Sequence, residues 1–312
     1  MINIIKNGIL CTLQGNYRHG YMQMGIPWSG PMDDLSMMGA NYLTGNDPLS
    51  TTLEMIIQGP EIRFKEGLQF AICGADMKPT LNGRPVPQNT LLLAERNDLL
   101  SFSPSENGLV TYLSFGGKIK VDKYLKSTST HVIAGLGGYF GRPLKAGDAL
   151  AIEPSLHHDP APIPNYFKFI GQQNPELRVL KGPELYLLNT PQQVSFIQNS
   201  YTISDKSNRM GIRLEAISPI RVGNSNITSS AVIPGTIQLP ESGNPIVMMR
   251  DHQTTGGYLR VGNIINHDLS YLSQTMPGNR IKLRWVTYDK SMDLNRKKYE
   301  TIEKLYNERA LN

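Results

Sequence analysis

Residues 250–258, with the sequence RDHQTTGGY, bring most kinds of hydrogen-bonding side chain into one short segment. The apolar run PIVMM precedes them and is typical of a buried strand, whose end is well placed to carry a site. Asp251 could accept a proton or bind a cation, and the amide of Gln253 suits an amide-like substrate. Gly256 and Gly257 would let the backbone approach a ligand closely. The alternative is a tight turn whose Asp and Thr side chains bond to their own backbone.

Two other segments in the second half of the chain offer groups that could complete such a site. Arg209, in SNRMGIRLE, could hold a carboxylate or phosphate through two hydrogen bonds, or could be an ordinary surface arginine. Gln238, in PGTIQLPESGNP, lies on a short strand between two turns and presents one amide. These residues together indicate a site lined by amides and a carboxylate.

Other kinds of chemistry have little support in the spacing of the residues. Ser29 lies in W-S-G-P rather than in the G-x-S-x-G of an esterase, so no catalytic triad is indicated. The histidines are not spaced as zinc ligands, and we predict no metal site. The glycine-rich segment 127–148 lacks the Lys-Ser/Thr of a Walker A loop, although its amides could still form a nest that binds an anion.

The composition is that of a globular protein large enough for two domains. The chain has 312 residues, of which 39% are hydrophobic and 18% are charged. The net charge of +5 is not accompanied by a known nucleic-acid reader motif, so we predict no nucleic-acid partner. Two cysteines make no disulfide framework, and the sequence indicates neither a signal peptide nor a membrane span. We therefore predict a cytoplasmic protein without a membrane partner.

Short strands at close spacing, separated by turn signals, predict a mainly β chain that forms barrels or sandwiches. Two of these strands flank Asn7-Gly8, a dipeptide that predicts a hairpin. Apolar residues at helical spacing predict short helices over 31–43 and 263–275.

The proline-rich stretch 154–177 interrupts this pattern and predicts an interdomain connection. It contains His157 and His158, which more often do nothing on such a linker than bind a metal. The expected parts of the chain are a first domain over 1–160, a second domain over 161–290 and a basic helix over 291–312.

Taken together, the motifs resemble one family, the KipA-like proteins, which are also known as the second subunit of allophanate hydrolase or the C subunit of 5-oxoprolinase. The same module occurs in the carboxyltransferase domain of biotin-dependent urea carboxylase. The resemblance rests on the runs GIPWSGPMDDLS, LGGYFGRPLKAGD, SNRMGIRLE, PGTIQLP and GNPIVMMRDHQTTGGY. Two first-half motifs depart from the family pattern: Q-D-x-G-R is here QGNYR at 14–18, and S-R-S-T is STST at 127–130.

The resemblance implies two cyclophilin-like β-barrel domains and membership of an ATP-dependent 5-oxoprolinase complex. The partners would be a KipI-like subunit and a LamB/YcsF-like subunit. The complex would open the lactam of 5-oxo-L-proline, a small cyclic amide, and yield L-glutamate. Without its partners the chain would be inactive.

A lactam is a poor electrophile, and phosphorylation of its oxygen would make it open to attack by water. A site for this reaction must hold the substrate carboxylate, polarise the lactam and move a proton. The candidate catalytic residues are Asp251, as a base or as the residue that orients Arg209, then Gln253, and Arg209 for the substrate carboxylate. The candidate substrate-binding residues are Gln238, Thr254, Thr255, Gly256, Gly257 and Tyr258, the last to cover the ring.

Two other functions are compatible with the same motifs. One is a carboxyltransferase-type subunit for a urea-like amide, whose biotin would come from another protein because this chain has no A-M-K-M run. The other is a KipA-like regulator that binds a KipI-like inhibitor of a sensor histidine kinase. The sequence leaves open which amide is the substrate, whether this chain itself contacts ATP, and how many copies of each subunit assemble.

Overall fold

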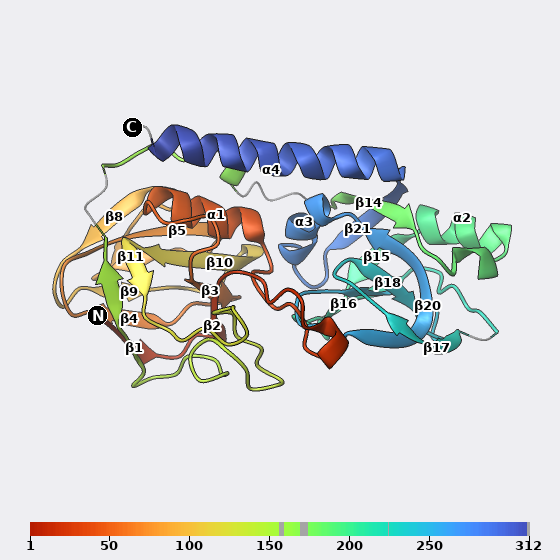
Figure 1. Cartoon of the computed structure of the whole chain (residues 1–312), viewed down its shortest axis with the longest axis horizontal. Coiled ribbons are helices and arrows are strands. Elements are labelled where there is room, and N and C mark those ends of the chain that lie inside the picture. Colours follow the sequence, from red (N-terminus) through yellow and green to blue (C-terminus); the bar gives the residue numbers. More distant parts are fainter. Residues whose placement is uncertain (156–158, 169–173, 224, 311–312) are drawn as a thin grey trace. The chain divides into compact units, whose positions relative to one another are not determined.

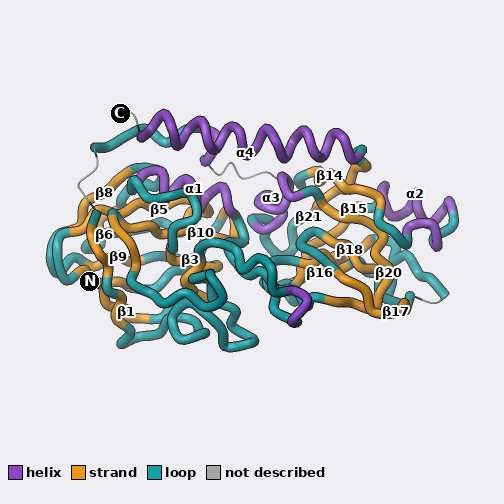
Figure 2. The backbone as a smooth tube through the Cα atoms, viewed as in Figure 1, coloured by secondary structure: helices purple, strands orange, loops and turns teal. Residues whose placement is uncertain are grey.

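The computed structural model describes residues 1–155, 159–168, 174–223 and 225–310 (Figure 1). The predicted connection over 154–177 is only partly included, and His157 and His158 lie outside the described residues. Strands joined by loops dominate the chain, and helices are few (Figure 2). The prediction of a mainly β protein is therefore confirmed.

The chain divides into two compact units. Unit 1 contains residues 1–18, 29–171 and 305–312, and unit 2 contains residues 19–28 and 172–304. Residues 19–28 thus belong with the second half of the chain, although the sequence places them in the first. None of the described helices combines the length and the apolar character needed to cross a bilayer.

Unit 1 is built from two main sheets that share one core. The six-stranded sheet has the order β12-β1-β4-β9-β6-β7, the five-stranded sheet has the order β2-β3-β10-β5-β8, and β11 pairs with β13. The strands are β1 (Ile2–Lys6), β2 (Leu10–Gln14), β3 (Thr52–Ile56), β4 (Glu61–Phe64), β5 (Leu68–Asp76), β6 (Thr80–Leu81), β7 (Arg84–Pro85), β8 (Leu91–Ala94), β9 (Leu99–Ser101), β10 (Asn107–Phe115), β11 (Gly117–Ile119), β12 (Ala149–Leu150) and β13 (Ile152–Pro154).

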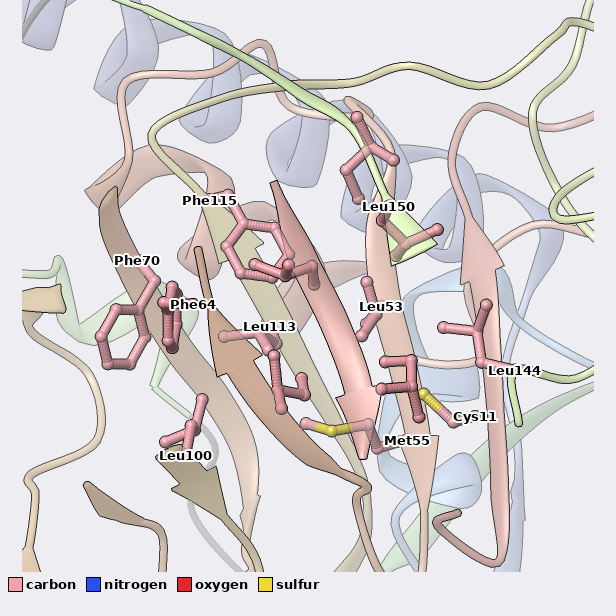
Figure 3. Close-up of a cluster of buried hydrophobic side chains, with 14 of the residues drawn as sticks. Cys11, Leu53, Met55, Phe64, Phe70, Leu100, Leu113, Phe115, Leu144 and Leu150 are labelled. Carbon is pink, nitrogen blue, oxygen red and sulfur yellow. The ribbon is translucent and has the colours of Figure 1, made fainter. Parts of the chain in front are cut away.

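Side chains from both sheets form the core of unit 1 (Figure 3). Phe64 and Leu100 come from the six-stranded sheet, and Phe70, Leu113 and Phe115 come from the five-stranded sheet. The ring of Phe64 packs against those of Phe70 and Phe115, with centroids 5.3 Å and 6.3 Å away. Burial of these apolar surfaces holds the two sheets together.

The hairpin predicted at Asn7-Gly8 is wrong, because β1 and β2 belong to different sheets. β1 pairs with β4 and β12, and β2 pairs with β3. The backbone at Gly8 instead passes Gln58, whose carbonyl oxygen accepts a hydrogen bond from Ile9 at 3.1 Å. Tertiary pairing here overrides a local turn preference.

The first helix, α1 (Asp34–Leu43), packs on the five-stranded sheet and begins a little later than the predicted range of 31–43. Asp33 caps it, since its side chain accepts hydrogen bonds from the backbone of Leu35 and Ser36. The short 3-10 turn η2 (Asn165–Phe167) packs beside α1.

Unit 2 contains a closed barrel. Its strands follow the order β14-β21-β15-β16-β19-β18-β20, and an antiparallel pairing of β14 with β20 closes the ring, while β17 extends β20 as an edge strand. The strands are β14 (Glu176–Lys181), β15 (Ser200–Ile203), β16 (Gly211–Ala216), β17 (Asn226–Ala231), β18 (Thr236–Leu239), β19 (Ile246–Met248), β20 (Thr255–Ile264) and β21 (Arg280–Trp285).

The helices of unit 2 only partly follow the predictions. The second predicted helix is shorter than 263–275, because residues to Ile264 continue β20, and only η4 (Asn266–Asp268) and α3 (Leu269–Ser273) are helical. The tail helix α4 (Tyr288–Ala310) is present, and its residues to 304 belong to unit 2 while its last residues belong to unit 1. In unit 2, η1 (Met22–Met24) and η3 (Leu185–Leu187) are short 3-10 turns. Helix α2 (Thr190–Gln198) was not predicted from the sequence, although Asn189 and Gln192 form a capping box at its start.

An ion pair between the half-buried Arg178 and the buried Asp268 links β14 to η4. Arg178 donates from its backbone N–H at 2.8 Å and from Nε at 2.9 Å to Oδ2 of Asp268, and its Nη2 donates to Oδ1. Burial alone would raise the pKa of the Asp268 carboxyl group, but the hydrogen bonds from Arg178 outweigh it and hold that pKa below its ordinary value.

We expect Asp268→Asn to lower the free energy of unfolding by roughly 3 kcal/mol near neutral pH, because Arg178, whose side chain is only 19% exposed, loses its counter-charge. The folded pKa lies below the unfolded one, so the carboxylate stabilises the fold above about pH 4 and loses this effect as the pH falls through the folded value. Urea unfolding of both proteins from neutral to acidic pH should therefore show a stability difference that narrows toward acid. A stability difference that stays constant over this pH range would contradict the conclusion that Arg178 lowers the pKa of Asp268.

Candidate functional site

The barrel of unit 2 brings together segments that are far apart in the sequence. Gly211 at the start of β16 pairs with Met248 at the end of β19. The backbone ladder continues beyond these strands, where the N–H of Asp251 donates to the carbonyl of Arg209 at 2.8 Å. Arg209 and the RDHQTTGGY run are therefore neighbours because of this strand register.

Arg209 and Asp251 form a buried ion pair with two hydrogen bonds. Nε of Arg209 donates to Oδ2 of Asp251 at 2.8 Å, and Nη2 donates to Oδ1 at 3.2 Å. Both side chains are only 5% exposed. Each oxygen of Asp251 thus accepts from Arg209, which is the arrangement of a charge partner that fixes the orientation of a guanidinium group.

Gln238 lies on β18, which pairs with β19, and its side-chain amide contacts the RDHQTTGGY run. Its side chain is 1% exposed, and its Oε1 accepts a hydrogen bond from Nε2 of the exposed Gln253 at 3.5 Å. Within the described ranges, Nε2 of Gln238 has no hydrogen-bond acceptor. A buried amide N–H group without an acceptor is costly, and a ligand oxygen would satisfy it.

Gly256 makes room for the Gln238 amide. A Cβ atom at Gly256 would lie 2.1 Å from Nε2 of Gln238, which is closer than non-bonded atoms approach. At Gly257 the nearest atom, the carbonyl oxygen of Ile227, would be 3.5 Å away, an ordinary contact. The first of the two glycines is therefore required by the position of Gln238, and the second is not.

A bulge shapes the strand that carries these glycines. The pairing of β18 with β20 shifts register between Ile237 and Gln238, which face Gly262 and Arg260 respectively. Bulges of this kind often redirect side chains beside functional sites.

The remaining predicted site residues lie along the surface of the same segment. Thr254 is half-buried and its carbonyl oxygen accepts from Val232 N–H at 3.1 Å. Thr255 and Tyr258 are exposed on β20, opposite β17. The structure thus brings together Arg209, Asp251, Gln238, Gln253 and Gly256, and places Thr255 and Tyr258 at the rim.

His19, which was not predicted from the sequence, belongs to unit 2 and lies near the RDHQTTGGY turn. Desolvation first, and the positive charge of Arg250 second, lower the pKa of the His19 imidazole below its ordinary value. The ring packs edge-on against Trp28, with centroids 4.6 Å apart. His19 and Arg250 are far apart in the sequence. Only the family resemblance of the motifs on either side of His19, QGNYR and GIPWSG, could have pointed to residues 19–28.

In unit 1 the QGNYR and STST motifs are joined by hydrogen bonds of Arg18. Arg18 is fully buried and donates to Ser29 Oγ at 3.2 Å and to the carbonyl oxygen of Ser129 at 2.6 Å. The QGNYR and STST runs thus meet at Arg18. In the same unit, Glu54 accepts hydrogen bonds from Tyr112 Oη at 2.6 Å and from Met32 N–H at 2.8 Å.

The glycine-rich loop uses several of its amides internally. Leu136 N–H donates to the carbonyl of His131 at 3.1 Å, and Gly141 N–H donates to the carbonyl of Gly137 at 2.7 Å. This geometry does not favour the anion nest considered for 127–148. Across the described part of the chain, no three His, Cys, Asp or Glu side chains gather as metal ligands.

The family model and the most similar relatives that we compared indicate the same family. Residues 24–285 match the model of the carboxyltransferase domain, subdomain A and B. The chain is 32% identical to the C subunit of 5-oxoprolinase from Escherichia coli (strain K12), over 98% of this chain and 97% of that protein. It is 31% identical to the C subunit of 5-oxoprolinase from Haemophilus influenzae, over 95% of each chain.

A solved structure has the same fold. The crystal structure of the K. lactis urea amidolyase superposes with a TM-score of 0.89 at 28% identity, covering 97% of this chain. The match covers only 20% of the amidolyase chain, so this protein corresponds to one part of that larger enzyme.

Proposed function

The chain belongs to the family of the carboxyltransferase domain, subdomain A and B, and from this premise we propose that it is a subunit of an ATP-dependent 5-oxoprolinase, which hydrolyses 5-oxo-L-proline to L-glutamate. Two relatives that it matches over nearly their whole length are named as the C subunit of 5-oxoprolinase. The observation that carries the proposal is the buried Arg209–Asp251 pair beside the Gln238 amide, which offers charge and amide groups suited to a lactam acid.

In this proposal each side chain has a stated task. Asp251 orients Arg209, and the guanidinium group attracts the carboxylate of the substrate. Gln238 Nε2 donates to the lactam oxygen, and Gln253 bonds to the same ring from the exposed side. Thr254, Thr255, Gly256 and Gly257 shape the strand along which the substrate lies, and Tyr258 covers the ring.

His19 is the group we assign to proton movement. Its lowered pKa keeps the imidazole neutral near physiological pH, so it can accept a proton. Asp251 is less suited to this task because both of its oxygens accept hydrogen bonds from Arg209.

The proposed activity requires ATP and two partner subunits in addition to this chain. ATP is a co-substrate of the assembled enzyme and activates the lactam oxygen by phosphorylation. The expected partners are a KipI-like and a LamB/YcsF-like subunit, and the expected compartment is the cytoplasm. The name of the relatives, which calls them subunits, supports the need for other chains.

One other function has a specific observation in its favour. The fold match to urea amidolyase supports a carboxyltransferase-type subunit, which would accept a carboxyl group from biotin carried by another protein. The site residues are compatible with either substrate because both are planar amides. The two proposals differ in the substrate carboxylate, which only 5-oxo-L-proline has and which Arg209 would attract.

A substrate comparison tests the proposal. The chain, mixed with the KipI-like and LamB/YcsF-like proteins, is supplied either with 5-oxo-L-proline and ATP or with urea, bicarbonate, ATP and a biotinylated carboxylase. We expect ATP-dependent glutamate release in the first mixture and no urea carboxylation in the second. The reverse outcome would replace the 5-oxoprolinase proposal by the carboxyltransferase one.

A further inference from the structure

A glycine-rich loop of unit 1 presents an aromatic ring to the outside. The side chain of Phe140 is 81% exposed, and its φ of 53° lies in the left-handed region that favours glycine. Ile133, on the same loop, is 69% exposed. A phenyl ring that is this exposed gains little from burial, and its backbone conformation is unfavourable, which points to a role in contact with another molecule.

The loop holds Phe140 in a fixed position. Gly141 N–H donates to the carbonyl of Gly137 at 2.7 Å, and the Cα of Gly141 packs so closely on the backbone of Gly135 that a Cβ atom would lie 2.1 Å from it. The ring of Phe140 stands edge-on against Tyr139 at 4.8 Å, and Tyr139 packs on the core of unit 1. A ring held in place before binding loses little conformational entropy when a partner covers it.

A second loop with exposed lysines lies beside the first. Arg18 connects the two loops, because its Nε donates to the carbonyl of Tyr124 at 3.3 Å and its Nη2 lies where a Cβ of Gly137 would be 2.7 Å away. Tyr124 is 42% exposed, and the exposed Lys123 and Lys126 flank it.

The charge of the segment that carries these residues indicates the kind of partner. The stretch from Lys118 to Asp148 contains six basic residues and two acidic ones, although the whole chain has only 31 basic against 26 acidic residues. A face with apolar rings among positive charges complements a negatively charged face with an apolar socket.

We propose that Tyr124, Ile133 and Phe140, with Lys123 and Lys126, form the docking surface for a second protein chain that has an acidic face and a socket for the Phe140 ring. The inference rests on the proposed function, in which the KipI-like subunit is that chain. A protein is favoured over a nucleic acid because the relatives of this chain are named as enzyme subunits.

The test measures the binding of the purified KipI-like subunit to the immobilised full chain by interferometry. Phe140→Gly removes the ring and relieves the positive φ, so the variant should melt no lower than the wild type. We expect its Kd to rise about 30-fold or more, as for a central aromatic residue of an interface. Lys123→Glu with Lys126→Glu should slow association and reduce its dependence on salt.

Tyr186→Ser is the matched control, because Tyr186 is a similarly exposed aromatic residue, at 76%, but belongs to unit 2. It should bind the KipI-like subunit with the Kd of the wild type. Equal Kd values for wild type and Phe140→Gly would overturn the docking surface, as would failure of the wild-type chain to bind the KipI-like subunit. Tight binding of single-stranded RNA that the same lysine substitutions abolish would also overturn it in favour of a polyanion site.

Failure of the proposed function gives a different result. If the subunits assemble through Phe140 but release no glutamate from 5-oxo-L-proline with ATP, the docking surface stands and the assigned reaction fails. If the wild-type mixture releases glutamate and Phe140→Gly changes neither Kd nor rate, only the docking surface fails.

Discussion

Replacing Asp251 with asparagine should lower ATP-dependent glutamate release by the assembled complex about 100-fold or more. Asparagine carries no charge and offers one oxygen where the carboxylate offers two, so Arg209 loses a hydrogen bond and its counter-charge. A guanidinium group that moves even slightly no longer holds a substrate in the reactive geometry, and losses of this size are usual for such misplacement. Initial rates with saturating ATP and varied 5-oxo-L-proline measure the effect.

Asp268→Asn is the control that separates activity from stability. Arg178–Asp268 is a second Arg–Asp pair in unit 2, with a buried carboxylate and a half-buried arginine, and it is separate from the Arg209–Asp251 pair of the candidate site. Both variants should unfold at lower urea concentrations than the wild type, since each leaves a buried or half-buried arginine without its counter-charge. Only Asp251→Asn should lose turnover per folded molecule, and an equal loss in both variants would show that the effect is one of stability.

The kinetic pattern also separates the two roles considered for Asp251. If Asp251 orients Arg209, then Arg209→Lys and Asp251→Asn should both raise KM for 5-oxo-L-proline and both lower kcat, with the pH dependence of kcat unchanged, because lysine cannot make the two-pronged contact. If Asp251 were the base, Asp251→Asn alone would lower kcat and change its pH dependence. If Asp251 only orients Arg209, the base is His19. In that case His19→Gln, which removes the neutral imidazole, should alter the pH dependence of kcat.

Gly256→Ala should lower turnover about 100-fold while costing little stability. The new methyl group would overlap Nε2 of Gln238, and the amide, as the end of a flexible side chain, would shift away. The lactam oxygen would then lose its donor, and removal of one such donor commonly costs this much in rate. Turnover and thermal melting of the same preparation provide the measurement.

A mutant cycle decides whether Gly256 acts through Gln238. Gln238→Ala alone should reproduce the loss, and the double variant should be no worse than Gln238→Ala, because the clash has then been removed. Gly257→Ala adds a methyl group on the same strand in ordinary contact, and it controls for the stability of β20. Additive losses in the double variant would contradict the assignment of Gly256 as the residue that positions Gln238.

Part of this site could be predicted from the sequence because its signals are local. Asp251 and Gln253 follow an apolar strand directly, and the apolar and polar runs mark that boundary. The pairing of Arg209 with Asp251 could not be predicted in this way, because it depends on the register between β16 and β19. His19 escaped notice for the same reason, since only the folded chain brings residues 19–28 into unit 2.

The fold shows the same division between local and tertiary signals. Strand spacing predicts the mainly β class, and apolar spacing predicts the helix that the structure shows as α1, capped by Asp33. The hairpin predicted at Asn7-Gly8 is wrong because pairing of β1 with β4 and of β2 with β3 separates the two strands. The apolar spacing that extends the second predicted helix back to residue 263 reflects Ile264, which is buried on β20.

The most direct test of the central claim is glutamate release from 5-oxo-L-proline and ATP in three mixtures. The first contains this chain alone, the second contains the KipI-like and LamB/YcsF-like proteins without it, and the third contains all three. We predict glutamate release, coupled to ATP hydrolysis, in the third mixture only. ATP-dependent release by this chain alone, or full activity of the two partners without it, would contradict the assignment of the chain as a required subunit.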